Sequence, residues 1–185
     1  MVAATESERR WMRGEPKGLL DGVPGSIKDL VLTKDWPTGW GSKANLRIPP
    51  PDVDAPCVAR LREHGAVLLG KTTSPEFGWK GVTDSPRTGI TRNPWNRDLT
   101  PGGSSGGAAV AAALGMGAVH VGSDGGGSIR IPAAFSGIFG FKPSFGRVPT
   151  FPASVYGTLS HVGPMTRCVA DAVLMLNVLA EPDSR

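Results

Sequence analysis

Two serine-containing glycine clusters, joined by an alanine-rich segment, constrain this chain more than any other feature of its sequence. The first is Gly102-Gly103-Ser104-Ser105-Gly106-Gly107, and the second is Gly125-Gly126-Gly127-Ser128. Glycine loses more backbone freedom on folding than any other residue, so a cluster of glycines is costly unless the local geometry requires it. The clusters therefore predict two sites at which the backbone comes very close to another group.

The composition is that of one globular domain. The 185 residues, of which 39% are hydrophobic and 19% charged, are enough to bury a core. The 26 glycines and 17 prolines predict many loops and tight turns. The net charge of +4 comes without a basic stripe, so we expect no nucleic-acid partner. Cys57 and Cys168 are expected to be free thiols, and no metal or organic cofactor is implied.

The chain contains no segment with the length of a membrane span. Its first residues, MVAATESERRWMRGEP, lack the apolar centre of a signal peptide. We therefore expect a cytoplasmic protein with no membrane partner.

Apolar patterning predicts helices that alternate with short buried strands, which is typical of an α/β fold. In the last predicted helix the apolar face is expected to hold Val169, Ala172, Val173, Leu176 and Leu179. Strands or extended segments are predicted over 23–32, 66–70, 117–123 and 139–141, with long loops over 36–51 and 74–96. Helices are predicted over 3–13, from an N-cap at Asp54 to His64-Gly65, and over 105–114, 128–135 and 167–180.

Ser128 is the best candidate nucleophile for amide hydrolysis. It follows three glycines and is predicted to open a helix, where free backbone N–H groups and the positive end of the helix dipole converge. The amides of Gly125, Gly126, Gly127 and Ser128 are therefore predicted to form an oxyanion hole. The absence of Cβ atoms at the glycines leaves room for a substrate carbonyl.

Lys28 is the best candidate base. None of the three histidines (His64, His120 and His161) has the sequence context of a catalytic triad, and each is expected to be structural. A lysine accepts a proton near neutral pH only if burial keeps it uncharged. The neighbours Ile27 and Leu30 favour such a semi-buried position.

The segment Gly22-Val23-Pro24-Gly25-Ser26-Ile27-Lys28-Asp29 and the two glycine clusters together resemble the signature of the amidase signature family of serine hydrolases. The resemblance covers nearly the whole chain. It implies an α/β amidase-signature fold, with a mixed β-sheet core flanked by helices, and a catalytic lysine, bridging serine and nucleophilic serine at Lys28, Ser104 and Ser128. It also implies a non-proline cis peptide bond at or beside Ser104.

In that family mechanism, neutral Lys28 takes the proton of Ser104, Ser104 takes the proton of Ser128, and Ser128 forms an acyl-enzyme. The resemblance also favours a role for Asp124 and Arg130 in orienting the loop, the alternative being an ordinary ion pair at a helix start. Gly125 departs from the family pattern, which usually has Thr or Ile there. A more flexible loop, with weaker preorganisation, is expected.

The expected function is hydrolysis of a carboxamide, and also of esters, with a small-molecule amide as substrate. Members of the family are considerably longer, so residues 1–185 are expected to be the N-terminal and catalytic-core part of one amidase signature domain, with its C-terminal part absent and the fold incomplete. The alternative is a catalytically incomplete fragment or a partner-dependent subunit, such as one of the amidotransferase type, acting as a homo-oligomer or with a completing chain. Ile131 argues weakly against the amidotransferase type, since many such subunits carry Gln there.

A weaker alternative is a nucleophile elbow of the α/β-hydrolases, because Gly102-x-Ser104-x-Gly106 matches its pattern. That motif follows directly on a strand, and residues 97–101 have a poor strand sequence.

Overall fold

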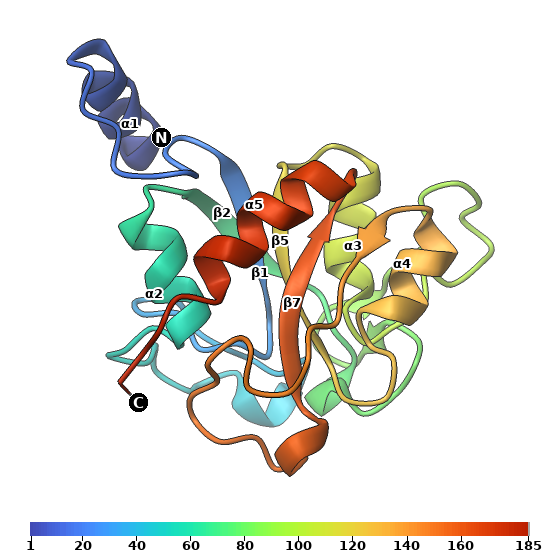
Figure 1. Cartoon of the computed structure of the whole chain (residues 1–185). Coiled ribbons are helices and arrows are strands. Elements are labelled where there is room, and N and C mark those ends of the chain that lie inside the picture. Colours follow the sequence, from blue (N-terminus) through green and yellow to red (C-terminus); the bar gives the residue numbers. More distant parts are fainter. Residues whose placement is uncertain (185) are drawn as a thin grey trace.

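A computed structural model describes residues 1–184. Its centre is a five-stranded mixed sheet of order β2-β1-β5-β7-β6 (Figure 1). Strands β1 (Pro24–Lys28), β2 (Val67–Thr72) and β5 (Val119–Asp124) are parallel, whereas β7 (His161–Thr166) and β6 (Phe139–Gly140) add antiparallel pairs. The structure confirms the predicted mixed sheet flanked by helices. A small hairpin of β3 (Asp84–Ser85) and β4 (Gly89–Ile90) lies within the predicted loop 74–96.

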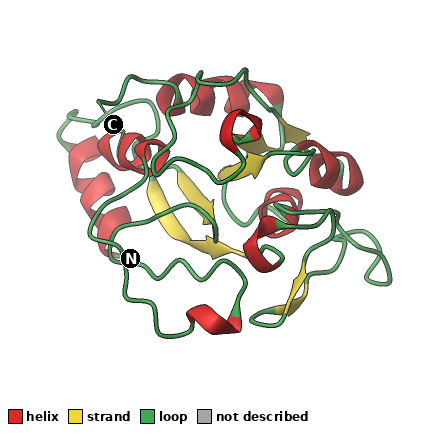
Figure 2. Ribbon diagram, turned by 90° about the horizontal axis from the view of Figure 1, so that it is seen from below, coloured by secondary structure: helices red, strands yellow, loops and turns green. Residues whose placement is uncertain are grey.

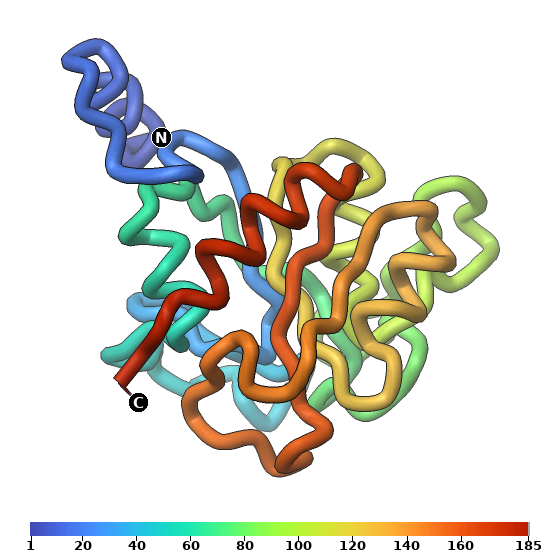
Figure 3. The backbone as a smooth tube through the Cα atoms, viewed as in Figure 1, coloured from blue at the N-terminus to red at the C-terminus, as the bar shows by residue number. Residues whose placement is uncertain are grey.

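Helices cover both faces of this sheet. Helices α2 (Pro56–Glu63) and α5 (Val169–Leu179) pack together over one face, and α3 (Gly106–Ala113) and α4 (Arg130–Ser136) pack together on the other (Figure 1). Helix α1 (Val2–Met12) projects from the body of the molecule, as the tube in Figure 3 shows. Short 3-10 helices are η1 (Lys43–Asn45), η2 (Glu76–Gly78) and η3 (Gly157–Leu159). Within the described residues, no helix is long and apolar enough to cross a membrane.

Strand alternation divides the sheet residues between these two layers. Ile27, Val119 and Val121 join the large core cluster under α2 and α5. Met165 joins a smaller cluster with alanines of α3. Ser26 and His120, neighbours across β1 and β5, hydrogen-bond at 2.7 Å. The even-numbered side chains of β1 and β5 therefore face the layer that contains the glycine clusters.

Three predicted element boundaries are wrong. The extended segment 23–32 leaves the sheet after Lys28, and the carboxylate of Asp29 accepts a hydrogen bond from the amide of Gly39 at 3.0 Å. Asp54 does not cap α2, whose N-cap residue is Ala55; its carboxylate accepts from the amide of Lys34. The helix predicted from Ser128 begins at residue 130, because the preceding amides bond to a carboxylate instead of forming a helical turn.

The predicted buried face of α5 is also partly wrong. Ala172, Met175, Val178 and Leu179 are buried, whereas Val169 is 56% exposed, and Val173 is 52% exposed. Nearly every residue of this helix is apolar, so its pattern does not single out one face.

Candidate active site

Lys28 is the last residue of β1, and its side chain is fully buried. Its Nζ donates to the Oγ of Ser104 at 2.7 Å, and to the Oγ and carbonyl oxygen of Ser123 at 3.0 and 3.3 Å. Burial lowers the pKa of Lys28 to about 7, although the nearby carboxylate of Asp124 acts in the opposite direction. In a large fraction of the molecules Lys28 is therefore uncharged at neutral pH, which is the state that can accept a proton.

Ser104 lies in the first glycine cluster, beyond a non-proline cis peptide bond between Gly103 and Ser104. Thr83 holds the cluster: its Oγ1 donates to the carbonyl of Gly102 at 2.8 Å and accepts from the amide of Gly106 at 3.1 Å. A Cβ on Gly103 would lie 2.7 Å from backbone atoms of Val82. The first cluster is thus a place of close backbone approach, as its glycines predict.

Asp124, at the end of β5, organises the second glycine cluster. Its carboxylate accepts from Arg130 at 2.9 and 3.0 Å, from the amide of Gly127 at 2.8 Å and from that of Ile129 at 3.1 Å. Burial alone would raise the pKa of Asp124, but these hydrogen bonds outweigh it and lower the pKa to about 2. The carboxylate is therefore ionised at neutral pH and fixes the turn that carries Ser128.

This arrangement reduces the set of predicted oxyanion donors. The amide of Gly127 is occupied by Asp124, whereas those of Gly125, Gly126 and Ser128 donate to no protein acceptor within the described residues. Nothing lies within 4 Å of a Cβ built on Gly126, and the nearest atom to one on Gly125 is the carbonyl of Leu159 at 3.8 Å. The positions of Gly125 and Gly126 thus border open space, and Ser128 lines the same cleft as they do.

Ser104 and Ser128 line one cleft of about 320 Å³, together with Ser123, Gly125 and Gly126. The amide of Ser105 donates to the carbonyl of Ser128 at 3.1 Å, so backbone contact ties the two glycine clusters together. None of the described hydrogen bonds involves the hydroxyl of Ser128. Of the predicted site residues, Ser104, Asp124, Gly125, Gly126 and Ser128 line this cleft, whereas Lys28, Gly127 and Arg130 do not. Lys28 is hydrogen-bonded to Ser104, and no described hydrogen bond joins Ser104 to Ser128.

The cleft lies where the parallel strands end. Lys28 ends β1, Ser123 and Asp124 end β5, and the glycine clusters precede α3 and α4. Figure 2 looks onto this end of the sheet, where loops cover the strand ends. Binding sites in open α/β sheets form at this edge, because the chain leaves each strand there in a loop.

Sequence reasoning missed two hydroxyls, those of Ser123 and Thr83. Ser123 accepts a hydrogen bond from Lys28, and Thr83 holds the loop of Ser104. The signal for Ser123 would have been the pairing of β1 with β5, and single-sequence patterning gives no strand pairing.

The histidines contact groups other than Ser104 and Ser128, and the Nδ1 of His161 lies 3.2 Å from the carbonyl oxygen of Asp124. His120 is buried and bonded to Ser26, and His64 pairs with Glu181 at 2.8 Å. The Nδ1 of His161 lies 2.8 Å from the carbonyl of Leu159. No described hydrogen bond joins a histidine to either serine of the cleft. Over residues 1–184, no group of three or more His, Cys, Asp or Glu is arranged to hold a metal ion.

The fold of this chain matches that of amidase signature enzymes of known structure. A bacterial aryl acylamidase of that family matches with a TM-score of 0.88 and 42% identity, over 99% of this chain and 39% of the other. The peptide amidase from Stenotrophomonas maltophilia matches with a TM-score of 0.89 and 39% identity, over 98% of this chain and 38% of the other. The model of the amidase family matches residues 2–185, and the chain belongs to that family.

Curated relatives carry two different names. A glutamyl-tRNA(Gln) amidotransferase subunit from Desulforapulum autotrophicum is 46% identical over all of this chain and 38% of its own length. Indoleacetamide hydrolase from Bradyrhizobium diazoefficiens is 42% identical over all of this chain and 36% of its own length. The chain thus spans well under half the length of these relatives.

Proposed function

We propose that this chain hydrolyses a carboxamide bond, and esters by the same chemistry, through an acyl-enzyme on Ser128. The observation that carries the proposal is the buried Lys28, whose pKa is lowered to about 7 and whose Nζ lies 2.7 Å from the Oγ of Ser104. A lysine uncharged at neutral pH and bonded to a serine hydroxyl is a proton acceptor that this hydroxyl can use. Ser104 opens onto the cleft that holds Ser128.

In the proposed reaction, Lys28 accepts the proton of Ser104 while Ser104 accepts that of Ser128. The Oγ of Ser128 attacks the amide carbon, and the developing oxyanion takes hydrogen bonds from the amides of Gly125, Gly126 and Ser128. The protons return through Ser104 to the leaving nitrogen as the C–N bond breaks. Water then attacks the acyl carbon while its proton passes through Ser104 to Lys28. As the bond between the acyl carbon and the Oγ of Ser128 breaks, a proton returns from Lys28 through Ser104 to that Oγ, and the carboxylic acid leaves. The hydrogen bonds of Asp124 keep the nucleophile turn in place.

A second candidate function is that of one component of an amidotransferase, which would act with a completing chain. The name of the relative from Desulforapulum autotrophicum supports it. Ile131, directly after Arg130, is the residue that speaks weakly against it. In either case we propose that residues 1–185 correspond to the N-terminal and catalytic-core part of one amidase signature domain.

The test is covalent labelling of the purified chain with a fluorophosphonate, read by intact mass, with Ser128→Ala beside it. We expect a single adduct that Ser128→Ala abolishes and that Ser104→Ala and Lys28→Ala slow severely. A variant lacking all three histidines serves as the matched control and should keep substantial reactivity. An adduct that persists in Ser128→Ala would refute the nucleophile assignment, and no adduct from the folded chain would favour the function that needs a completing chain.

A further inference from the structure

Among the described residues, three oxygen atoms accept hydrogen bonds from the amine of Lys28. They are the hydroxyl oxygens of Ser104 and Ser123 and the carbonyl oxygen of Ser123. The charged amine has three N–H groups, one for each of these oxygens. The neutral amine has two N–H groups and one lone pair, so one hydroxyl must donate to the lone pair instead, because a carbonyl oxygen cannot donate. The proposed reaction needs that donor to be Ser104.

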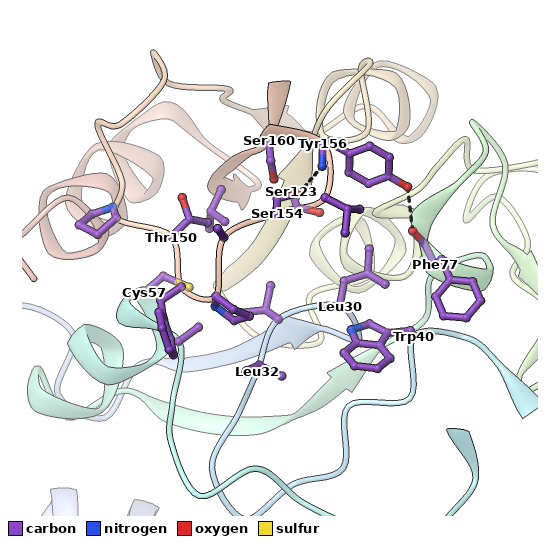
Figure 4. A pocket seen from close by; sticks show the side chains of 18 residues that line it. Leu30, Leu32, Trp40, Cys57, Phe77, Ser123, Thr150, Ser154, Tyr156 and Ser160 are labelled. Atoms are coloured by element: carbon purple, nitrogen blue, oxygen red, sulfur yellow. Dashed lines mark hydrogen bonds between the residues drawn. The ribbon is translucent and has the colours of Figure 1, made fainter. Parts of the chain in front are cut away.

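The two hydroxyls differ in where else their protons can point. Ser104 is 2% exposed, and the side-chain hydrogen bond that the structure gives it is the one with Lys28. Ser123 is only partly buried and lines two hollows, the cleft and a neighbouring hollow of about 470 Å³ (Figure 4). The proton of Ser123 can therefore point into open space, which leaves its oxygen free to accept from Lys28. The buried proton of Ser104 then has the lone pair of the amine as its acceptor.

The backbone of Ser123 is held where this contact requires it. Its amide donates to the Oγ of Ser105 at 3.3 Å, and the same Oγ donates to the carbonyl oxygen of Ser123 at 3.1 Å. Ser105 is fully buried and follows Ser104 directly in the chain. The two serines that contact Lys28 thus belong to one hydrogen-bonded unit, which limits how far their backbones can move apart.

We propose that Ser123 is a positioning residue for the reaction: its hydroxyl accepts one N–H of neutral Lys28 and so directs the lone pair of the amine at Ser104. This inference rests on the proposed function, because the direction of the lone pair affects the rate only if Lys28 is the base. Ser123 itself takes up and gives away no proton. Without its hydroxyl, the N–H that it accepts would turn to the oxygen of Ser104, and the lone pair would point away from the proton that it has to remove.

The hydroxyl of Ser123 also favours the charged form of Lys28, because an ammonium group donates a stronger hydrogen bond than a neutral amine. Removing this hydroxyl should therefore lower the pKa of Lys28. The carboxylate of Asp124, which pairs with Arg130, is the charged group that acts on Lys28, and its own hydrogen bonds do not involve Ser123. Other titratable groups around Lys28 and the cleft bond elsewhere: Asp29 and Lys71 to the loop after β1, His120 to Ser26, His161 to the carbonyl oxygens of Asp124 and Leu159, and Lys80 to Asp84.

The test compares Ser123→Thr with Ser123→Val, two side chains of the same shape of which only threonine has a hydroxyl. The two hollows leave room for the added methyl, and the second methyl of valine keeps water from replacing the hydroxyl. Ser160→Ala is the matched control, because Ser160 lines the same two hollows and makes no described hydrogen bond to Lys28 (Figure 4). The rate constant for fluorophosphonate labelling at Ser128 is measured against pH for each variant.

Above the pKa of Lys28, we expect labelling of Ser123→Val to be slower than that of Ser123→Thr by about thirtyfold, the effect of one buried donor left without a partner. The acidic limb of its pH profile should lie about one pH unit lower, because the charged amine has lost an acceptor. Ser123→Thr and Ser160→Ala should keep the acidic limb of the unmodified chain. Equal rates for Ser123→Val and Ser123→Thr would overturn the proposal, whether both are fast or both are slow.

A direct measurement of the pKa of Lys28 separates its orientation from its strength as a base. The pKa is read by NMR on the chain labelled with ¹³C-lysine, with Lys28→Met to assign the signal. A weaker base by itself slows the reaction by less than the change in its acid dissociation constant, because the proton is only partly transferred in the transition state. The difference in rate between Ser123→Val and Ser123→Thr must therefore exceed the difference in this constant. A smaller difference in rate would overturn the orienting role of Ser123.

The same NMR measurement separates this inference from the proposed function, because it needs no reaction. If the unmodified chain forms no adduct while the pKa of Lys28 is lower in Ser123→Val than in Ser123→Thr, the hydroxyl of Ser123 is the partner of Lys28 and the proposed function fails. If the adduct forms at Ser128 and the pKa of Lys28 is the same in both variants, the proposed function stands and the inference about Ser123 is wrong.

Discussion

Replacing Lys28 by methionine should stabilise the folded chain at neutral pH while it removes the proposed base. The lysine has a pKa of about 7 when folded and 10.5 as its ordinary value. Between these two values the unfolded chain binds the proton and the folded chain does not, so stability rises with pH across this window. Keeping Lys28 buried therefore costs about 4 kcal/mol at pH 7 and about 2 kcal/mol at pH 9.

Methionine fills much the same volume and carries no charge. It also leaves the hydroxyls of Ser104 and Ser123 without their shared donor, a loss of about 1–3 kcal/mol that does not depend on pH. The informative quantity is thus the difference in free energy of unfolding between Lys28→Met and the unmodified chain, measured in urea at pH 7 and pH 9. Relative to the unmodified chain, Lys28→Met should be more stable at pH 7 than at pH 9, by about 2 kcal/mol.

Leu61→Ala provides the control, because it opens a cavity in the core and removes no titrating group. Its difference from the unmodified chain should be the same at both pH values. If the difference for Lys28→Met is also the same at both, then Lys28 keeps an ordinary pKa in the folded state. Lys28 would then be protonated at neutral pH and could not act as the proposed base.

Three further outcomes can be measured on the same chain. Gly125→Ala should be neutral or stabilising by about 0.4–1 kcal/mol in urea denaturation, whereas Gly127→Ala, at φ +124°, should cost more than about 1 kcal/mol; equal effects would contradict the geometry of the turn. Asp124→Asn removes the charge that raises the pKa of Lys28, so the acidic limb of kcat/KM should move to lower pH, and a move to higher pH would be inconsistent with that coupling. Burial lowers the pKa of His120 to about 4, so the free energy of unfolding should fall by about 3 kcal/mol between pH 6.5 and pH 4 because of this residue. His120→Gln should lack this part of the pH dependence. The same dependence of the free energy of unfolding on pH in that variant would contradict the assignment to His120.

Local patterns pointed to Lys28 and Ser128 as candidates, and Ser104 was expected from the resemblance to the amidase signature family. Three glycines before Ser128 and a single lysine in an apolar run are short-range signals, and the structure brings Lys28 and Ser104 into contact. The catalytic roles of these residues stay predictions until the labelling and the variants are measured. The α/β class was predictable because strands and helices alternate in the sequence, whereas the mixed sheet was expected from the resemblance to the amidase signature family.

Other features depended on contacts between distant segments. The carboxylate of Asp124 accepts a hydrogen bond from the amide of Gly127 because of the geometry of one turn. No pattern of residue types in the sequence indicates this bond. The role of Ser123 needed the pairing of β1 with β5. The buried face of α5 was misjudged, because an apolar helix packs on the face its neighbours offer, and those neighbours are far away in sequence.

The hydrogen bonds of Lys28 have a consequence for how this site comes into being. Lys28 is bonded to Ser104, 76 positions away, and to Ser123, 95 positions away. A short segment of the chain that folds locally therefore cannot contain both partners of either bond. A contact across such a separation forms only when the intervening chain has condensed around it. If the proposed function holds, a covalent titrant of Ser128 would react only with molecules in which β1, β5 and the loop of Ser104 are assembled. It would then measure the native fraction of a preparation, which a spectroscopic average does not.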